Sequence, residues 1–384
     1  MIKIIDKQQC NGCNACAEIC PNKSIAMKVD EEGFFYPHVS VKKCIQCGLC
    51  ERICPVINKG VNDGDIHTLN VYGAINKNET VRLASSSGGV FTLLAEYILA
   101  QGGVVFGAAF TEDFVVKHVC IERVEEIAKL RGSKYVQSDT REIYAQVKRC
   151  LQAGREVLFT GTPCQVEGLL AFLGKKYENL VTQDIICHGV PSPELFRQYL
   201  QYKSSGRVIK ELSFRDKSKG WQLYHYKIVY ADETEYLNDF YEDEYSKMFL
   251  KNLSLRPSCY NCAFKIKNRL SDITLADFWG CEQVAPQLFD DKGTSLVFVH
   301  SRKGKELFES VKDQVISCEV AAETAIQYNT FMVWSAQKPE LREEFMRAVS
   351  RGRGFNWIER KILKIKAKER LRKKLGYLKR RLFK

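Results

Sequence analysis

Residues 10–21 (CNGCNACAEICP) and residues 44–55 (CIQCGLCERICP) repeat one spacing, Cys-x2-Cys-x2-Cys-x3-Cys-Pro. A [4Fe–4S] cube needs four thiolates, and one tight Cys-x2-Cys-x2-Cys loop supplies only three. In such runs the Cys before Pro ligates the other cluster. The repeat therefore predicts a dicluster ferredoxin domain over residues 1–57, with one cluster on Cys10, Cys13, Cys16 and Cys54 and the other on Cys44, Cys47, Cys50 and Cys20.

Two other metal sites share parts of this spacing. Repeated Cys-x2-Cys is typical of zinc ribbons, but zinc gives no reason for the third Cys and the Cys-Pro at the same offsets in both halves. A radical-SAM site is not supported, because Asn22 and Lys23 stand where a third Cys would follow Cys16 and Cys20. Residues 58–70, rich in Gly, Asn and Asp, are predicted to be a linker.

The overall composition is that of a globular protein with an unusual number of cysteines. The 384 residues include 16 Cys, and 45% of them are hydrophobic. No segment approaches the roughly 18 uninterrupted apolar residues of a membrane span, and the first residues do not resemble a signal peptide. We therefore expect a cytoplasmic protein, where clustered cysteines favour metal binding over disulfides.

The positive charge is concentrated in residues 351–384. This segment has fifteen Lys and Arg against two acids, so it carries +13 and the remaining residues carry −1 of the net +12. The neutral remainder gives no reason to expect nucleic acid as a partner. Apolar residues recur at helical spacing in the tail, which predicts a basic amphipathic helix with Phe355 and Trp357 among its interfacial candidates. Its role stays open between peripheral contact with the inner membrane face, docking on a partner protein, and a merely solvated helix.

Residues 71–340 predict an α/β domain, because short apolar runs alternate with amphipathic stretches. The Ser and Gly residues at 85–89 come before an apolar-periodic run at 90–100 and a strand-like run at 104–110. A helix that begins at such a loop offers unpaired N–H groups to a phosphate. A serine N-cap with glycines for close packing is an equally good interpretation.

A second unit of this domain is a predicted βαβ motif. Residues 157–160 and 181–187 are typical of buried strands, and a helix follows the first of them at 165–173. Thr162 is the expected N-cap and Pro163 occupies the first helical position. The two strands are therefore expected to be parallel.

Four cysteines of this domain are candidates for a third metal site. Cys164 and Cys187 would lie at the carboxyl ends of the two parallel strands, where open α/β sheets bind ligands. Together with Cys259-x2-Cys262 they make four thiolates, for which an iron–sulfur cluster, a zinc site and four unrelated buried thiols all remain as interpretations. The other four cysteines lack ligand spacing and are expected to be inert: Cys120, Cys150, Cys281 and Cys318.

A colinear set of motifs between residues 71 and 330 is similar to a known family. The motifs are Ser87-Gly88-Gly89-Val90-Phe91-Thr92, Gly132-Ser133-Lys134-Tyr135, Thr162-Pro163-Cys164-Gln165, Cys187-His188-Gly189, Cys259-x2-Cys262 and Ser271-Asp272-Ile273. As a set they resemble the family of beta subunits of coenzyme F420 hydrogenases and dehydrogenases. The N-terminal dicluster ferredoxin is similar to an arrangement found within that family.

This resemblance implies an FAD beside a third [4Fe–4S] cluster. The cluster would be held by the cysteines at 164, 187, 259 and 262, and the flavin by Ser86, Ser87, Gly88, Gly89, Thr92, Lys134 and Ser138. A flavin accepts a hydride as an electron pair and passes electrons singly to clusters. The expected fold class is then α+β / α/β, with an N-terminal dicluster ferredoxin-like domain, an α/β flavin- and iron–sulfur-binding domain, and a basic C-terminal helix.

Two residues are candidates for proton chemistry near the flavin. His188 has a suitable ordinary pKa, although such a histidine is more often a supporting hydrogen-bonding group. Asp277 ends an apolar strand and has the alternative role of capping a turn. Family members that use F420 carry a Glu-containing context after the second cluster Cys, whereas residues 187–192 here read CHGVPS. The substrate is therefore left open.

We expect an iron–sulfur flavoenzyme that exchanges electrons between clusters and a two-electron substrate. The substrate would be F420 or another small hydride donor or acceptor, such as a sugar or glycan intermediate, and the partner an electron-transfer protein or redox complex. The alternative is a non-catalytic electron-transfer subunit of a larger redox complex. A membrane scaffold with structural clusters and no flavin is a third hypothesis.

Overall fold

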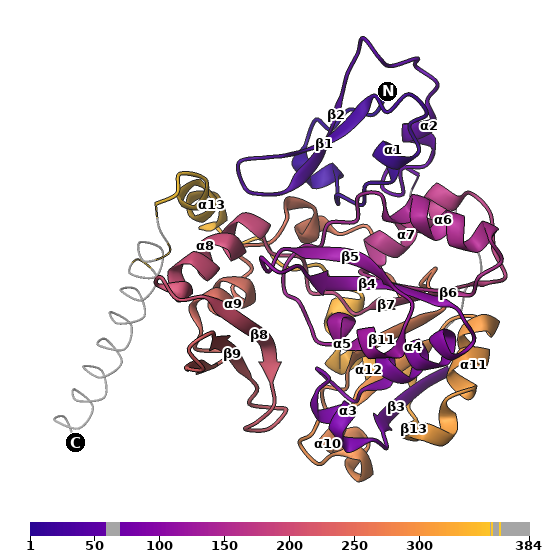
Figure 1. The fold of residues 1–384 in the computed structure, drawn as a ribbon, viewed down its shortest axis with the longest axis vertical. Coiled ribbons are helices and arrows are strands. Elements are labelled where there is room, and N and C mark those ends of the chain that lie inside the picture. Colours follow the sequence, from indigo (N-terminus) through magenta and orange to yellow (C-terminus); the bar gives the residue numbers. More distant parts are fainter. Residues whose placement is uncertain (59–69, 354, 356–360, 362–384) are drawn as a thin grey trace, which may run out of the picture.

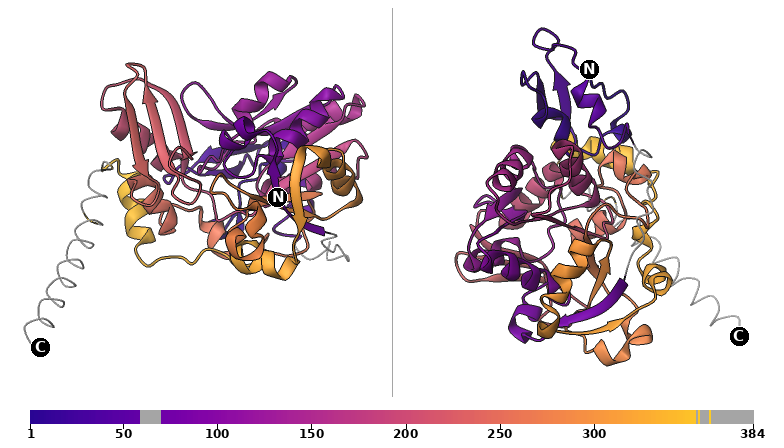
Figure 2. Two further views of the ribbon diagram at one scale, coloured as in Figure 1. Left: turned by 90° about the horizontal axis from the view of Figure 1, so that it is seen from below. Right: turned by 90° about the vertical axis from the view of Figure 1, so that its right-hand side faces the viewer.

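The computed structural model describes residues 1–58, 70–353, 355 and 361, and it places a small N-terminal module at one end of a larger mixed domain (Figures 1 and 2). The module has one antiparallel strand pair, and each cysteine repeat supplies a short helix. Its elements are η1 (Lys7–Gln9), α1 (Ala15–Glu18), β1 (Ile25–Val29), β2 (Phe35–Val39) and α2 (Leu49–Arg52). This is the expected ferredoxin-like region.

An eight-stranded mixed sheet forms the centre of the large domain. Its strands are β3 (Asn70–Asn76), β4 (Val104–Phe110), β5 (Val116–Ile121), β6 (Val157–Thr160), β7 (Leu180–Ile185), β11 (Ile273–Asp277), β12 (Ser295–Val299) and β13 (Val315–Glu319). They lie in the order β13-β3-β12-β11-β7-β6-β4-β5. The inner strands β4, β6, β7 and β11 are parallel, and the remaining pairs are antiparallel.

Helices cover both faces of this sheet. Successive side chains of a strand point to opposite faces, so neighbouring strand residues pack with different helices. Val105 and Leu158 pack with α4 and α11, whereas their neighbours Val104 and Val157 pack with α6 and α7. The antiparallel end is covered by α10 and α12. The helical elements of this part are α3 (Glu79–Leu83), α4 (Val90–Ala100), η2 (Val124–Glu126), α5 (Ile127–Leu130), α6 (Ile143–Gln152), α7 (Pro163–Leu173), η3 (Pro257–Asn261), α10 (Cys281–Val284), η4 (Pro286–Leu288), α11 (Arg302–Glu309), η5 (Lys312–Gln314), α12 (Ala322–Tyr328) and η6 (Thr330–Met332).

A second antiparallel sheet lies to one side of the large domain (Figure 1). It contains β8 (Ile209–Asp216), β9 (His225–Tyr230) and β10 (Glu235–Asp239), in the order β10-β9-β8. Three helices accompany it, α8 (Pro193–Ser204), α9 (Glu244–Leu250) and α13 (Arg342–Ser350). Together they bury an aromatic core that includes Phe214, Tyr226 and Tyr245.

The predicted local elements are largely confirmed. β6 and β7 pair in parallel on either side of α7, whose N-terminus is a capping box of Thr162 and Gln165 with Pro163 in the first turn. The helix expected at 90–100 and the strand expected at 104–110 are α4 and β4. The fold class is confirmed as mixed α/β with a ferredoxin-like N-terminal region, and antiparallel strands make the main sheet mixed.

The tail and the linker fall mostly outside the described residues: of 351–384 and 58–70, the structure describes only 351–353, 355, 361, 58 and 70. Phe355 corrects one expectation. Its ring is 3% exposed and packs on Tyr199 and Tyr202, with centroids 5.4 Å from each, so it belongs to the aromatic core and not to an interfacial face. Within the described residues, no helix has the length and apolarity to cross a bilayer.

A buried ion pair holds the turn of the module's hairpin on the large domain. Both Nη atoms of Arg342, on α13, donate to the Glu32 carboxylate, at 3.0 and 2.7 Å. The two side chains are 2% and 11% exposed. Next to this pair, Gly33 adopts φ +89° against α8, where a Cβ atom would lie 2.5 Å from the Glu194 Cβ. The turn is therefore fixed by charge and by close packing.

We predict that Glu32→Gln lowers the free energy of unfolding by about 3 kcal/mol, because the buried guanidinium loses its bidentate carboxylate and keeps only the exposed Glu343, at 3.7 Å. Glu31→Gln is the matched control, since Glu31 is 75% exposed and lies 3.9 Å from Lys7. It should change stability by less than about 0.5 kcal/mol. Denaturant unfolding of both variants measures the difference, and equal midpoints would contradict the role of the ion pair.

Candidate functional site

Two cavities in the module are each lined by four cysteines. The first, here the Cys10 cavity, is lined by Cys10, Cys13, Cys16 and Cys54. The second, here the Cys47 cavity, is lined by Cys20, Cys44, Cys47 and Cys50. Each set takes three cysteines from one repeat and one from the other, so the structure brings together the two groups expected from crossed ligation.

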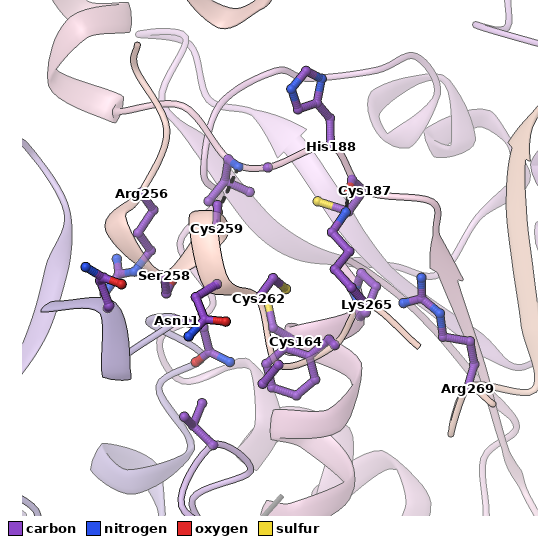
Figure 3. Close-up of a pocket in the computed structure, with 18 residues that line it drawn as sticks. Asn11, Cys164, Cys187, His188, Arg256, Ser258, Cys259, Cys262, Lys265 and Arg269 are labelled. Atoms are coloured by element: carbon purple, nitrogen blue, oxygen red, sulfur yellow. Dashed lines mark hydrogen bonds between the residues drawn. The ribbon is translucent and has the colours of Figure 1, made fainter. Parts of the chain in front are cut away.

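A third set of four cysteines meets where the module rests on the large domain (Figure 3). Cys164 lies in the first turn of α7, and Cys187 follows β7, so both come from the carboxyl edge of parallel strands. Cys259 belongs to η3 and Cys262 follows it directly. All four line one space, here the Cys164 cavity.

The walls of the Cys164 cavity are cationic. Among the described residues no Asp or Glu lines it, whereas three positively charged side chains do: Arg256, Lys265 and Arg269. Burial raises the pKa of the Cys259 thiol to about 12, and it also raises the pKa of Cys164 and Cys187. Cysteines bind metal as thiolates, a form that positive surroundings favour. The side chains present therefore fit an anionic, thiolate-bound group.

The arrangement of the cysteines bears on the kind of metal group. Each set of four cysteines surrounds a cavity. A zinc ion needs its sulfur ligands about 2.3 Å from one centre, whereas a cube is bound at its corners. Four thiols around a space suit the cube.

Arg256 lies between the Cys10 cavity and the Cys164 cavity. Its side chain is fully buried and donates from Nε to the Cys10 carbonyl at 2.8 Å and from Nη2 to the Phe35 carbonyl at 2.9 Å. Nη1 donates to Gln137 Oε1 at 3.0 Å, and Nη2 lies 3.6 Å from Cys10 Sγ. No carboxylate of the described residues pairs with it. A buried cation with neutral partners only is suited to anionic groups on either side.

The cysteine-lined cavities form a series that ends in a fourth, larger cavity. Ile2 lines the Cys10 cavity and donates its backbone N–H to Cys50 of the Cys47 cavity at 3.3 Å. Asn11 and Val56 line both the Cys10 cavity and the Cys164 cavity. Residues 187–190 line both the Cys164 cavity and the large cavity. The order from the module inward is thus Cys47, Cys10, Cys164 and large cavity.

The large cavity holds about 600 Å³ and contains most of the predicted flavin residues. Ser86, Ser87 and Gly89 line it. Gly88 and Thr92 do not: the Gly88 amide donates to Ser295 Oγ at 2.9 Å, and Thr92 Oγ1 accepts from Arg131 Nε at 3.1 Å. A Cβ on Gly88 would lie 2.4 Å from the Ala74 carbonyl oxygen, so this glycine allows the loop to pack on the sheet.

Several hydroxyl and amine groups of the predicted flavin set already have protein partners. Ser87 Oγ donates to the Thr294 carbonyl at 2.7 Å, and Ser86 Oγ accepts from the Ser133 amide at 2.7 Å. The Lys134 ammonium donates to three carbonyls at the end of α5, at 3.1 to 3.2 Å. Burial lowers the pKa of Lys134 to about 7. These contacts shape the wall of the cavity.

The two candidate proton donors both line the large cavity. His188 Nε2 donates to Asn252 Oδ1 at 2.6 Å, and its ring stacks on Phe331 with centroids 4.0 Å apart; burial lowers its pKa. Asp277, the last residue of β11, accepts from the Arg215 guanidinium at 2.5 Å. Both side chains therefore have firm partners, and a role in proton transfer stays a prediction for each.

A hydrogen-bonded series of side chains that no sequence motif indicates runs from the large cavity to Cys164. His118 Nε2 donates to the Thr160 carbonyl at 2.9 Å, so its Nδ1 accepts from Ser138 Oγ at 3.0 Å. Ser138 Oγ accepts from Gln165 Nε2 at 2.9 Å. Thr162 Oγ1 then lies 3.0 Å from Gln165 Oε1 and 3.1 Å from Cys164 Sγ. Burial lowers the pKa of His118 to about 4, which keeps this ring neutral.

Comparison with known proteins gives three matches to families. Residues 71–144 match the family model for the N-terminal region of the coenzyme F420 hydrogenase/dehydrogenase beta subunit. Residues 154–324 match the family model for the C-terminal region of the same subunit. Residues 9–58 match the 4Fe-4S dicluster domain. The first two matches cover most of the large domain, and the third covers the module.

The individual proteins that this chain resembles share limited sequence identity with it. One subunit of the F420H2 dehydrogenase of Methanosarcina mazei is 20% identical over 331 residues, which are 82% of this chain and 85% of the relative. The coenzyme F420-dependent sulfite reductase of Methanocaldococcus jannaschii is 27% identical over 175 residues, 44% of this chain and 26% of the relative. A solved F420-reducing [NiFe] hydrogenase complex from Methanosarcina barkeri contains a chain with TM-score 0.48 and 16% identity, covering 70% of this chain and 89% of that one.

The family matches confirm the resemblance drawn from the motifs and the dicluster assignment of the cysteine repeat. Iron–sulfur clusters in the module and an oxidoreductase role follow from them. The chain belongs to the family of coenzyme F420 hydrogenase/dehydrogenase beta subunits and carries a 4Fe-4S dicluster domain in its N-terminal region.

Proposed function

We propose that this chain is an iron–sulfur flavoprotein oxidoreductase that exchanges electrons between [4Fe–4S] clusters and a two-electron substrate. The observation that carries the proposal is the series of four cavities. Three are each lined by four cysteines, and the last has the size of a cofactor and ligand site. Because neighbouring cavities are joined by shared or contacting residues, groups bound in them would lie next to one another.

The Cys164 cavity is the proposed site of the third [4Fe–4S] cluster. Four cysteines from three separate segments meet there, and the side chains of Arg256, Lys265 and Arg269 line the same space. The fully buried Arg256 lies on its wall beside the Cys10 cavity. Negative charge on thiolate-bound clusters in both cavities would compensate this guanidinium. The proposed ligands are Cys164, Cys187, Cys259 and Cys262.

The N-terminus of α4 is the proposed binding site for the diphosphate of FAD. Its N-cap, Gly89, has φ +82°, and no side chain caps the first turn, so backbone N–H groups are available to an anion. Arg131 lines the same cavity and contacts α4 through Thr92. A flavin bound here would supply the exchange between a hydride and single electrons.

The substrate is proposed to be a small hydride donor or acceptor, with coenzyme F420 as the first candidate. Two relatives are named for coenzyme F420 chemistry. The large cavity offers aromatic walls to a planar or ring-shaped molecule, including Tyr224, Tyr241 and Trp279, and Trp279 is backed by Trp221 at a centroid distance of 4.9 Å. The sequence of residues 187–192 leaves other small molecules as candidates.

A non-catalytic electron-transfer subunit is the second candidate function. The F420H2 dehydrogenase relative, which matches 82% of this chain, is itself named a subunit, and Cys47 is exposed at the outer end of the series. Anaerobic mixing of the isolated chain with reduced F420 or other hydride donors, with a viologen dye as electron acceptor, separates the two. Turnover by the chain alone supports the oxidoreductase, and turnover only with a partner complex supports the second candidate.

We predict that Cys259→Ser removes about four iron atoms per chain, from about twelve to about eight, because one cube loses a ligand. Cys281→Ser is the matched control, since Cys281 is a buried thiol that lines none of the cysteine-lined cavities. Iron and sulfide counted after anaerobic purification give the answer. Equal iron in both variants would remove the third cluster from the proposal.

For the flavin, Arg131→Gln should weaken FAD binding about tenfold or more, since a charge-assisted hydrogen bond contributes about 1.5–3 kcal/mol. Arg123→Gln is the control, because the Arg123 side chain is 72% exposed and lies outside the cavity lining. Fluorescence titration of FAD into flavin-free protein measures both. Unchanged affinity in Arg131→Gln would argue against a diphosphate at α4.

Replacing Arg256 by Gln should lower the reduction potential of the cluster at Cys10 by about 60 mV, the one-electron equivalent of a tenfold change in equilibrium constant. Loss of a nearby cation makes the more negative, reduced state harder to form. Arg141→Gln is the control, because Arg141 also contacts the module, over the Phe35 ring, but is paired with Asp139. Potentiometric titration followed by electron paramagnetic resonance reports the shift, and identical potentials would refute the electrostatic role.

A further inference from the structure

The outer end of the cavity series is open to the surface. Of the cysteines in the Cys47 cavity, Cys47 is exposed, whereas Cys50 is buried. Met1 lines the same cavity, and Figure 1 shows the N-terminus on the part of the module that projects from the large domain. A redox group in this cavity would therefore be the one within reach of another protein.

The surface around Cys47 has an apolar and basic character. We define the outer loop surface as residues 21–23 and 41–46, two loops that are joined by a hydrogen bond from Asn22 Nδ2 to the Lys43 carbonyl at 3.4 Å. Val41 and Ile45 are 69% and 60% exposed there. Three exposed lysines lie beside them, and no Asp or Glu occurs in either loop: Lys23, Lys42 and Lys43.

The acidic residues of the module are engaged elsewhere. Glu32 pairs with Arg342 of the large domain, and Asp30 pairs with Lys7 near the same hairpin turn. Two acids flank the outer loop surface in the sequence: Glu18 accepts from the Ala145 amide of the large domain at 2.8 Å, and Glu51 binds the N-terminal ammonium at 2.8 Å. None of the three lysines forms an ion pair with any residue that the structure describes. The outer loop surface therefore presents uncompensated positive charge.

We propose that the outer loop surface docks an acidic one-electron carrier protein, and this inference rests on the proposed electron-transfer function. Exposed apolar residues at the centre with charges around them are typical of a protein interface. In the docked pair one electron passes between the carrier and the cluster at Cys47, so one of them is oxidised and the other reduced by one electron. No covalent bond forms or breaks.

Charge complementarity decides the kind of partner. Lysines around a short apolar patch attract a carrier with acidic residues around its own redox centre and repel a basic one. Such steering raises association rates by about ten to a thousandfold and weakens as salt screens the charges. The competing explanation is that the lysines only offset the charge of the cluster beside them, and it predicts no effect on partner binding.

The test compares the full chain with the variant Lys23→Glu/Lys42→Glu/Lys43→Glu. Lys28→Glu is the matched control, an exposed lysine on β1 of the same module outside the outer loop surface. The probe is a purified acidic ferredoxin with two [4Fe–4S] clusters, in its oxidised form, and its binding is measured by calorimetry at low and high salt. Iron content and thermal unfolding of each variant confirm that the module is intact.

The expected result is that the triple variant binds the acidic ferredoxin at least tenfold more weakly than the unchanged chain at low salt. Lys28→Glu should stay within about twofold, and added salt should weaken binding to the unchanged chain. Equal affinity in the triple variant, or binding that does not depend on salt, would overturn the docking proposal. Binding of the oxidised carrier is measured without turnover. Two separate experiments test the proposed function: reduction of the chain by dithionite, and reaction of the chain with a hydride donor.

Discussion

The buried guanidinium of Arg256 is the contact on which the arrangement of the cysteine-lined cavities depends. It donates to two carbonyls of the module, at Cys10 and Phe35, while lining the Cys164 cavity of the large domain. Gly168 in α7 allows the two parts to approach, because a Cβ there would lie 2.8 Å from the Cys13 Cβ. Charge and close packing thus bring the cysteine sets of two domains into one series.

The parts of this structure that could be predicted from sequence are those set by local spacing. The cysteine repeat determines which thiols can share a cluster, and the structure groups the same two sets of four. The α7 unit was predictable for the same reason, since Thr162, Pro163 and Gln165 specify a helix start within four residues. Because parallel strands end at one edge of a sheet, the proximity of Cys164 and Cys187 also followed.

Features that depend on tertiary packing could not be predicted from the sequence. Nothing near Arg256 in the sequence indicates that it lies beside Cys10, 246 residues away. The hydrogen-bonded series from His118 to Cys164 joins β5, the segment between α5 and α6, and α7, and no motif spacing reveals these hydrogen bonds. The Ser and Gly loop was correctly expected at a helix N-terminus. The structure was needed to show that Gly88 packs against the sheet while Gly89 lines the large cavity.

Magnetic coupling between reduced clusters tests the proposed order of the redox sites most directly. Pulsed electron paramagnetic resonance of the fully reduced chain, with single-ligand variants to assign each signal, gives the relative strength of each pairwise coupling. The series Cys47, Cys10, Cys164 predicts that the cluster at Cys10 couples to both others more strongly than those two couple to each other. A stronger coupling between the clusters at Cys47 and Cys164 would contradict it.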